Sequence, residues 1–422
     1  MNNNICVVEL PGEKNYAVIS PSRVVFGLKA SKKEINDLIR EENLEQLKDK
    51  LSTGVLYDSS IVSLGIIPTL DCNLRCVYCY ARGGDTKEVI PLELAKDAIR
   101  CATANPDEKK LRLYLVGGGE TLLYFDLVKE IVDYAESIYQ EVWLDVVSNG
   151  TFNKEVLDWL VSNKVNTKIS YDGVMQNIQR PFEDGSDSSS VVEENIKNLI
   201  GSEAFVIAQC IITDLGINTM HRTIDRAVSL GVKAIKFEPA LSSTVSRSKS
   251  EVEPDPKEYA KALLSAVEYV VDQAYDLTVD TGFFAEPSRE HYCGMSTNNR
   301  VVTPHGKITS CVEVARPSDP YAETIMIGQV KDGKMILDNS RRKNLLKYHY
   351  DNQLGGCKIC NLRLICHGGC PMANIWKGGL PIRKSEFICT VEHTLLPRLL
   401  LMIAEDPKVA SIVMEDASID RF

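Results

Sequence analysis

The sequence predicts an α/β fold in which parallel strands form a partial (β/α)6 barrel, followed by a cysteine-rich C-terminal third. Six apolar runs of strand length alternate with amphipathic helical patterns, which is typical of parallel βαβ units with right-handed crossovers. Six such units suit an open barrel better than a closed eight-stranded one. The cysteines are the third observation, because ten of the 13 fall into two spaced groups.

The order of elements follows from the hydrophobic pattern. The expected strands are 61–67, 111–116, 142–147, 165–171, 204–212 and 232–238. The expected helices are 91–104, 125–139, 153–162, 190–200, 217–229 and 256–274. In barrels of parallel strands the functional site gathers on the loops at the carboxyl ends of the strands. We therefore expect the loop after the first strand to carry chemistry.

That loop contains three cysteines, Cys72, Cys76 and Cys79, in the run LDCNLRCVYCY. Thiolates at this spacing can hold three irons of a [4Fe–4S] cube and leave the fourth iron open. An open iron can chelate the amino and carboxylate groups of S-adenosylmethionine (SAM) and pass one electron to its sulfonium. A zinc site and a disulfide are the alternatives. Zinc ribbons usually close as two CxxC pairs on one small knuckle, whereas this loop precedes a long α/β segment.

Composition limits the classes of partner. The N-terminus MNNNICVVEL has no basic region, long apolar core or small-residue cleavage site, so we expect a cytoplasmic protein in which disulfides are disfavoured. No apolar run approaches membrane-spanning length, which predicts no membrane partner. The net charge of −10 and the dispersed lysines argue against nucleic-acid binding.

Short motifs at successive strand ends resemble those of the radical SAM superfamily. The matching residues are Gly118, Gly119 and Glu120 after the second strand, Ser148 and Asn149 after the third, Ser170 and Asp172 after the fourth, and Tyr78 before the third cysteine. The resemblance implies that Glu120 accepts a hydrogen bond from the methionyl ammonium of SAM. It places the third and fourth strand ends beside methionine or ribose, and Tyr78 against adenine. Singly these motifs are weak, since NG and DG are often only turns.

The C-terminal cysteines resemble the CX9-15GX4C…CX2CX5CX3C…C signature of SPASM domains. The matching residues are Cys293, Gly306, Cys311, Cys357, Cys360, Cys366, Cys370 and Cys389. The resemblance implies two auxiliary [4Fe–4S] clusters, one on Cys357, Cys360, Cys366 and Cys389 and one on Cys293, Cys311 and Cys370. With the first cluster this makes three, together with SAM as the second cofactor. The other cysteines, Cys6, Cys101 and Cys210, are expected to be core residues.

Departures from the family pattern bear on the substrate. Anaerobic sulfatase-maturing enzymes have a further cysteine shortly before the equivalent of Cys293, and an aspartate directly after the equivalent of Cys311. This chain has FFAEPSREHYC before the first position, and Val312 and Glu313 after the second. Both differences favour peptide maturases that leave an iron free for a substrate cysteine. Alternatively Glu286, His291 or water fills that position, or the cluster is an electron relay.

Four segments are expected. They are an N-terminal cap or shortened leader-peptide module (1–60), the radical SAM partial barrel (61–280), the SPASM domain (281–395) and a C-terminal helix and tail (396–422). In the first segment, the sequence pattern predicts strands near 4–10 and 15–26 and helices near 32–39 and 43–51. These elements would form either a hairpin and helix pair that caps the barrel, or a module that binds a leader peptide as an added strand. Residues 183–190 and 241–256 are expected to be mobile loops.

The resemblance predicts an enzyme that modifies a ribosomally made peptide, by Cys thioether crosslinking after hydrogen abstraction by a 5′-deoxyadenosyl radical. Its expected partners are a precursor peptide with a leader and a flavodoxin or ferredoxin-type electron donor. Other SPASM chemistries remain open: carbon–carbon crosslinking, epimerisation, sulfatase maturation and haem-pathway decarboxylation. A non-catalytic iron–sulfur electron carrier is the other class, but it would need no SAM pocket at Glu120, Ser148 and Ser170. No catalytic residue is assigned.

Overall fold

The computed structural model describes residues 5–20, 24–40, 61–103, 109–241, 243, 247, 252–282, 291–296, 299–346, 356–379 and 383–413. The chain divides into two compact units. We call Asp58–Pro254 with Thr297–Leu346 the sheet unit, and Met1–Tyr57 with Asp255–Ser296 and Lys347–Phe422 the terminal unit. Each unit contains residues from both sides of 281, the expected boundary between the barrel and the SPASM domain, and the four expected segments stay a prediction.

Six parallel strands form the centre of the sheet unit. They are β4 (Ile61–Ile66), β5 (Lys110–Leu115), β6 (Glu141–Ser148), β7 (Asn166–Ser170), β8 (Val206–Ile212) and β9 (Ala234–Pro239). Each strand pairs in parallel with the next along the chain. Alternate residues such as Leu111, Leu113 and Leu115 are fully buried, as a strand with one covered face requires. All six expected strands are confirmed to within two residues at each end.

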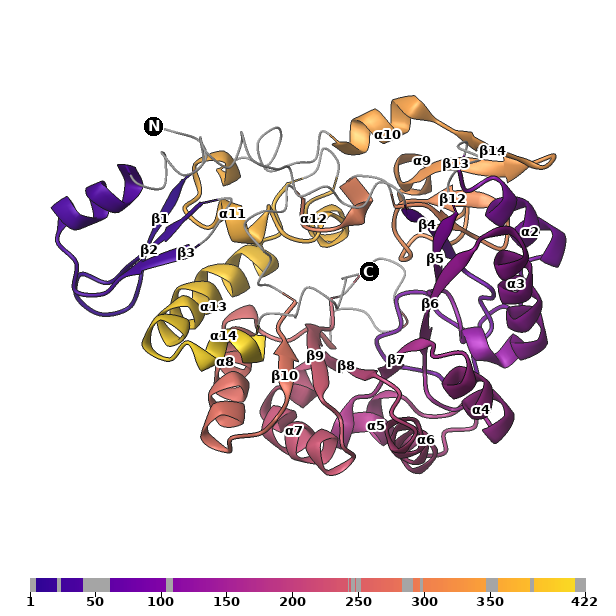
Figure 1. Cartoon of the computed structure of the whole chain (residues 1–422), viewed down its shortest axis with the longest axis horizontal. Coiled ribbons are helices and arrows are strands. Elements are labelled where there is room, and N and C mark those ends of the chain that lie inside the picture. The colour runs from indigo at the N-terminus through magenta and orange to yellow at the C-terminus, as the bar shows by residue number, and fades with distance from the viewer. Residues whose placement is uncertain are drawn as a thin grey trace. The chain divides into compact units, whose positions relative to one another are not determined.

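Helices separate these strands as the alternation predicts. They are α2 (Leu92–Arg100), α3 (Phe125–Ile138), α4 (Lys154–Ser162), α6 (Ser189–Gly201) and α7 (Met220–Ser229). Figure 1 shows α2 and α3 side by side along β4, β5 and β6. Short helices that the sequence pattern did not predict directly follow several strands: η1 (Thr121–Tyr124), η2 (Gly173–Met175), α5 (Gln176–Gln179) and η3 (Asp214–Thr219). They shape the loops at the carboxyl ends of the strands.

The sheet continues past β4 with strands from the C-terminal third. The order from β9 back to β4 is followed by β11 (Val301–Val302), β12 (Lys307–Thr309), β13 (Met326–Lys331) and β14 (Lys334–Leu337). β11 is parallel to β4, and the later pairs are antiparallel. The helices α9 (Ala322–Ile325) and α10 (Asn339–Leu346) complete this part. The signature residue Cys311 therefore belongs to the sheet unit.

The terminal unit combines the N-terminal sheet with C-terminal helices. Its elements are β1 (Cys6–Glu9), β2 (Tyr16–Ile19), β3 (Val24–Gly27), a helix over 32–40, α8 (Pro256–Asp272), β10 (Thr278–Asp280), η5 (Gly294–Ser296), η6 (Cys357–Ile359), α11 (Arg363–Cys366), α12 (Pro371–Gly378), α13 (Glu386–Glu405) and α14 (Lys408–Val413). β2 lies between β1 and β3, and both pairs are antiparallel. The expected strand 15–26 is thus a hairpin, and the expected helix 43–51 lies outside the described residues.

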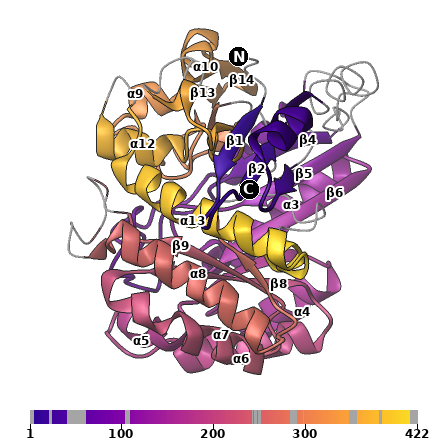
Figure 2. The same cartoon turned by 90° about the vertical axis from the view of Figure 1, so that its left-hand side faces the viewer.

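The helix α13 corrects one expectation about apolar segments. It is 20 residues long with a mean hydropathy of 1.5 over its best window, so it is long and apolar enough to cross a membrane. Half of that window is buried inside the protein. Figure 2 shows α13 running beside α8, against which it packs. A buried apolar face is also what a core helix requires.

Candidate cofactor site

The cysteine loop is fixed to the carboxyl end of β5 by backbone hydrogen bonds. The Gly119 amide donates to the Thr69 carbonyl at 2.9 Å, and the Glu120 amide donates to the Asp71 carbonyl at 2.7 Å. A Cβ on Gly119 would lie 1.9 Å from the Asp71 carbonyl oxygen, so the contact requires glycine. Gly118 has φ +74°, and a Cβ there would approach the Thr69 carbonyl to 2.7 Å. The two glycines therefore allow Glu120 to reach the cysteine loop.

Glu120 joins the ends of β5 and β6. Its Oε1 accepts hydrogen bonds from Ser148 Oγ at 2.8 Å and the Leu122 amide at 3.1 Å, and its Oε2 accepts one from the Asn149 amide at 2.6 Å. The carboxylate is 4 % exposed. Burial raises its pKa, although these hydrogen bonds and the Arg180 charge act in the opposite direction. A carboxylate has about four acceptor positions, so these donors leave room for one more. An ammonium donor at that position would offset the cost of burial.

Asn149 connects this carboxylate with the first cysteine. Its side-chain amide donates to Asn73 Oδ1 at 2.8 Å and lies 3.9 Å from Cys72 Sγ. Burial, with the nearby Glu120 charge, raises the pKa of the Cys72 thiol to about 12. Burial also raises the pKa of Cys76 to about 11. Such thiols become thiolates when a metal displaces the proton, which suits ligands of a cluster.

A second polar group surrounds Asp172 after β7. Its Oδ2 accepts from Tyr78 Oη at 2.6 Å and Gln179 Nε2 at 2.7 Å, and its Oδ1 accepts from the Ile211 amide at 2.9 Å. Arg180 Nε is 3.1 Å from the same Oδ2, and both side chains are almost fully buried. The expected residues Tyr78 and Asp172 therefore contact each other, while Ser170 lies opposite Gln209 in the β7–β8 register.

Arg180 is a site residue that the sequence motifs did not indicate. Its guanidinium lies over the Tyr78 ring, 5.2 Å from the centroid, and Nη1 is 3.8 Å from Cys76 Sγ. Burial disfavours a bare charge, yet the negative Asp172 and its hydrogen bond raise the pKa of Arg180 above its usual value. A permanent cation is thus held beside the second cysteine. The sequence feature that could have indicated Arg180 is a single arginine shortly after the DG turn that follows the fourth strand.

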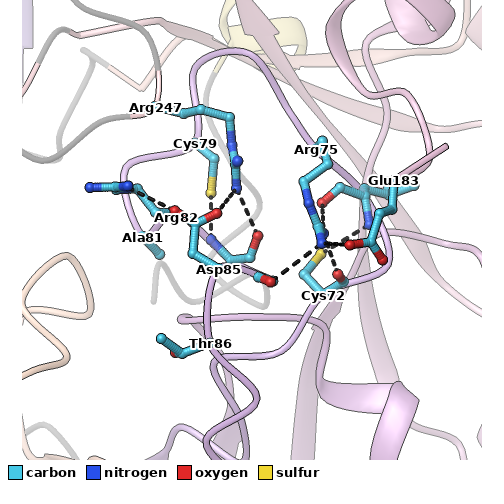
Figure 3. Close-up of polar contacts among 12 residues, drawn as sticks. Cys72, Arg75, Cys79, Ala81, Arg82, Asp85, Thr86, Glu183 and Arg247 are labelled. Carbon is cyan, nitrogen blue, oxygen red and sulfur yellow. Dashed lines mark hydrogen bonds and ion pairs between the residues drawn. The ribbon is translucent and has the colours of Figure 1, made fainter. Parts of the chain in front are cut away.

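Two further arginines hold the loop itself (Figure 3). Arg75 Nη1 donates to the carbonyls of Cys72 at 2.7 Å and Leu74 at 3.0 Å, and Nη2 pairs with Glu183. Arg247 donates to the Gly83 carbonyl at 2.9 Å and pairs with Asp85 at 2.9 Å. Glu183 belongs to the segment 183–190 that was expected to be mobile, and its amide also donates to the Asn73 carbonyl at 3.0 Å. This segment supports the cysteine loop.

The terminal unit brings four signature cysteines close to one another. The pKa of the Cys357 thiol is raised to about 11, first by burial and then by the neighbouring thiolates of Cys360 and Cys389. Burial raises the pKa of Cys366, with Cys360 and Cys357 adding to it. Lys384 Nζ is 3.6 Å from Cys389 Sγ and offers a positive charge to the group. Cys357, Cys360, Cys366 and Cys389 together offer four thiols, which is the donor number of a [4Fe–4S] cube.

The remaining signature cysteines are divided between the units. Cys293 and Cys370 lie in the terminal unit, and Cys311 lies in the sheet unit, so their common cluster stays a prediction. Cys370 caps α12, where its sulfur accepts from the Ala373 amide at 3.5 Å and faces the positive end of the helix. Glu286, one alternative fourth ligand, lies outside the described residues.

The Cys311 loop contacts the first cysteine loop inside the sheet unit. A Cβ on Gly117 would lie 3.0 Å from Val312 Cβ, so Val312 packs closely on the end of β5. Arg316 Nη1 donates to the Ala81 carbonyl at 3.0 Å, and Nη2 lies 3.3 Å from Thr86 Oγ1. The two cysteine loops are therefore joined by direct contacts.

Within the described part of the chain, no three His, Cys, Asp or Glu side chains converge tightly enough to hold a single metal ion. In a cube each thiolate binds a different iron, whereas the ligands of one zinc ion surround a single point.

Parallel strands with a three-cysteine loop after the first one define a class of α/β proteins that hold an iron–sulfur cluster at the strand ends. Residues 66–227 match the family model of the Radical SAM superfamily. This match implies one [4Fe–4S] cluster and SAM as cofactors. An uncharacterized protein of Methanocaldococcus jannaschii is 26 % identical over 174 residues, which are 40 % of this chain and 58 % of that protein. The chain thus spans little more than half the length of this curated relative.

Solved structures share the fold over most of the chain. One is native anSMEcpe with bound AdoMet and Kp18Cys peptide, at 18 % identity and TM-score 0.69, covering 83 % of this chain and 100 % of that one. Another is Streptococcus suis SuiB bound to precursor peptide SuiA, at 12 % identity and TM-score 0.57, covering 92 % and 99 %. At these identities the likeness concerns the fold. It confirms the mixed α/β architecture with a parallel sheet core expected from the sequence.

Proposed function

We propose that this protein is a radical SAM enzyme that modifies a ribosomally made precursor peptide, by thioether crosslinking at a cysteine. The observation that carries the proposal is the shared hydrogen-bonded group of Glu120, Ser148 and Asn149 beside Cys72. An electron carrier has no use for a buried carboxylate with one acceptor position free next to its cluster. When bound, the cluster and SAM supply a carbon radical that abstracts hydrogen from a substrate.

The residues of the chain have distinct tasks in this proposal. Cys72, Cys76 and Cys79 hold three irons, and Glu120 accepts the methionyl ammonium. Arg180 supplies a positive charge that stabilises a negatively charged group next to it. The Asp172 carboxylate orients the guanidinium of Arg180 and the hydroxyl of Tyr78. Tyr78, Ser148, Asn149 and Ser170 would line the nucleoside and methionine portions. Because Glu120 and Asp172 are held by several donors before any cofactor binds, little reorganisation is needed.

The substrate class rests on fold and on cysteine chemistry. Solved structures with this fold are bound to precursor peptide SuiA and to the Kp18Cys peptide. The stretch before Cys293 has no further cysteine, so we assign three cysteines to the inner auxiliary cluster and a substrate thiolate to its free iron. The place of an aspartate after Cys311 is taken by Val312, which packs on Gly117 and cannot act as a base. The other SPASM chemistries remain the alternatives within this class.

The N-terminal sheet is the proposed leader-peptide module. Arg363 of α11 donates to the Ile5 carbonyl at 3.1 Å and to the Cys360 carbonyl at 3.0 Å, so the first strand is tied to the four-cysteine site. Cys6 Sγ also lies 3.9 Å from the Cys360 carbonyl oxygen. In the described sheet β3 is an outer strand, which leaves an edge for an added peptide strand. Successive backbone amides of a strand point to opposite edges, so only one of the amides of Val25 and Phe26 faces the free edge of β3. Val25→Pro and Phe26→Pro should therefore weaken the binding of the leader peptide to different extents.

The decisive experiment is anaerobic reconstitution. The wild type should hold roughly twelve irons per chain, by three cubes of four, and should form 5′-deoxyadenosine from SAM under dithionite. Replacing Cys72, Cys76 and Cys79 together by Ala should leave roughly eight irons and abolish 5′-deoxyadenosine. Continued formation of that product by the triple variant would overturn the proposal. The active enzyme should be found in the cytoplasm, with a flavodoxin or ferredoxin replacing dithionite.

A further inference from the structure

Arg247 lies beyond β9, yet it contacts the third cysteine of the first loop. Its backbone amide donates to the Cys79 carbonyl at 3.0 Å. Its guanidinium donates to the Gly83 carbonyl at 2.9 Å and pairs with Asp85 at 2.9 Å, as Figure 3 shows. The side chains of Arg247 and Asp85 are 26 % and 28 % exposed, so the pair is largely shielded from water. Arg247 and Gly83 are 164 residues apart in the sequence.

Gly83 is the residue through which this contact reaches a cluster ligand. Its amide donates to Cys79 Sγ at 3.4 Å, while its carbonyl is the group that Arg247 holds. A Cβ on Gly83 would lie 3.0 Å from the Gly118 carbonyl oxygen and 3.1 Å from Cys72 Cβ. The backbone at Gly83 is therefore confined between the first cysteine and the glycine motif on one side and Arg247 on the other. Its amide is aimed at sulfur by the groups around it.

A hydrogen bond to a cluster sulfur stabilises the reduced cluster, because reduction adds negative charge to iron and sulfur. We propose that Arg247 is a positioning residue for the first cluster, which holds the Gly83 backbone so that its amide donates to the Cys79 sulfur and raises the reduction potential. The inference rests on the proposed function and adds a residue that none of the sequence motifs contains. Arg247 acts through Gly83 and does not touch sulfur itself.

Arg82 supplies a matched control. It pairs with the same Asp85 carboxylate at 2.9 Å, but its side chain is 59 % exposed and lies within the loop. Arg82→Ala therefore removes a partner of Asp85 without releasing the Gly83 carbonyl. Arg247→Met removes the guanidinium while keeping an apolar stem. Arg247→Lys retains a cation that can reach one of the two acceptors, and should restore part of the effect.

The test is a potentiometric titration of the fully reconstituted protein, following the electron paramagnetic resonance signal that SAM perturbs. In Arg247→Met the reduced-to-oxidised ratio of that cluster at a fixed potential should fall about tenfold, which is a shift of about 59 mV for one electron. Arg82→Ala should titrate like wild type, and Arg247→Lys should lie between. Iron content should remain unchanged in all three. SAM cleavage should slow with a weak electron donor and recover with excess dithionite.

Two outcomes would overturn the inference. If Arg247→Met titrates like wild type, Arg247 has no influence on the cluster. If Arg82→Ala shifts the potential as much as Arg247→Met, the charge of Asp85 is responsible and the Gly83 contact is not. Failure of the proposed function would look different, because no cluster signal would respond to SAM even in the wild-type protein.

Discussion

The carboxylate of Glu120 accepts a 2.6 Å hydrogen bond from the Asn149 amide, so the ends of β5 and β6 share one buried negative group. The same Asn149 reaches Cys72 through its side chain. A change at this carboxylate is therefore expected to affect cofactor binding before it affects the fold of the strands.

Glu120→Gln should weaken SAM binding by about tenfold to a hundredfold, because a charge-assisted hydrogen bond to an ammonium contributes on the order of 1.5–3 kcal/mol. An amide keeps the shape of the side chain but loses the charge. Equilibrium binding of SAM to the reconstituted protein measures the effect. Iron content should stay the same, and Glu155→Gln, on the exposed face of α4, is the control that should bind SAM normally. Unaltered affinity in Glu120→Gln would mean that the end of β5 does not bind the ammonium.

Asp172→Asn should destabilise the sheet unit. Asp172 is fully buried and compensates the buried Arg180 charge, and removing one partner of a buried pair costs about 3–5 kcal/mol. Asparagine would also present an amide where Tyr78 and Gln179 now donate. In thermal unfolding this should appear as a fall in Tm of roughly 6–20 °C. Lys154→Ala breaks a pair whose side chains are 81 % and 60 % exposed, and should cost less than about 1 kcal/mol.

The sequence allows those parts of the candidate site to be predicted that are local or repeated. The spacing of the three cysteines on one loop directly indicates a cluster site. The contact between Glu120 and Ser148 can be predicted because the carboxyl ends of neighbouring parallel strands lie at the same edge of the sheet. Arg180, Arg247 and Glu183 could not be found in the same way. Their partners lie 104, 164 and 108 residues away, and the pairing depends on the path of irregular loops. The division into two units could not be predicted from the sequence either. It depends on the pairing of β11 with β4, and that pairing covers only two residues.

A pH-dependent contribution to stability is expected from Glu193 on α6. Burial acts to raise its pKa, but hydrogen bonds from Arg226 and Tyr171 outweigh it, so the pKa in the folded protein is lowered. A lowered folded-state pKa gives stability that is present above the unfolded value of about 4.3 and is lost as pH falls through the folded value. Arg226 is 47 % exposed, which reduces the contribution through solvent screening.

Glu193→Gln should accordingly lower the free energy of unfolding by about 1 kcal/mol at pH 7. The difference from wild type should shrink below pH of about 4.3, where the unfolded chain also binds the proton. Urea unfolding of the full chain at pH 7, 5 and 4 measures it. A difference that stays constant over this range would show that packing, and not the charge of Glu193, is responsible.

The last prediction concerns the inner auxiliary cluster, to which we assign Cys293, Cys311 and Cys370. A soft thiolate is the natural fourth partner of iron, and ligation would remove the thiol proton and hold the sulfur in place. Arg316 joins the Cys311 loop to the loop that carries Cys79, and Val312 packs on Gly117 at the end of β5, so a sulfur bound there would be fixed relative to the first cysteine loop. Fixed geometry of this kind is what a directed carbon–sulfur bond requires.

Adding a cysteine-containing precursor peptide should therefore perturb the electron paramagnetic resonance signal of one auxiliary cluster. The same peptide with Cys→Ser should bind through its leader but leave that signal unchanged, which separates ligation from peptide binding. Cys311→Ala should remove the response to the cysteine peptide while the four-cysteine cluster on Cys357, Cys360, Cys366 and Cys389 keeps its own signal. If both peptides perturb the cluster equally, or if Glu286 or His291 proves to be the fourth ligand, the cluster serves electron transfer and the thioether chemistry loses its main support.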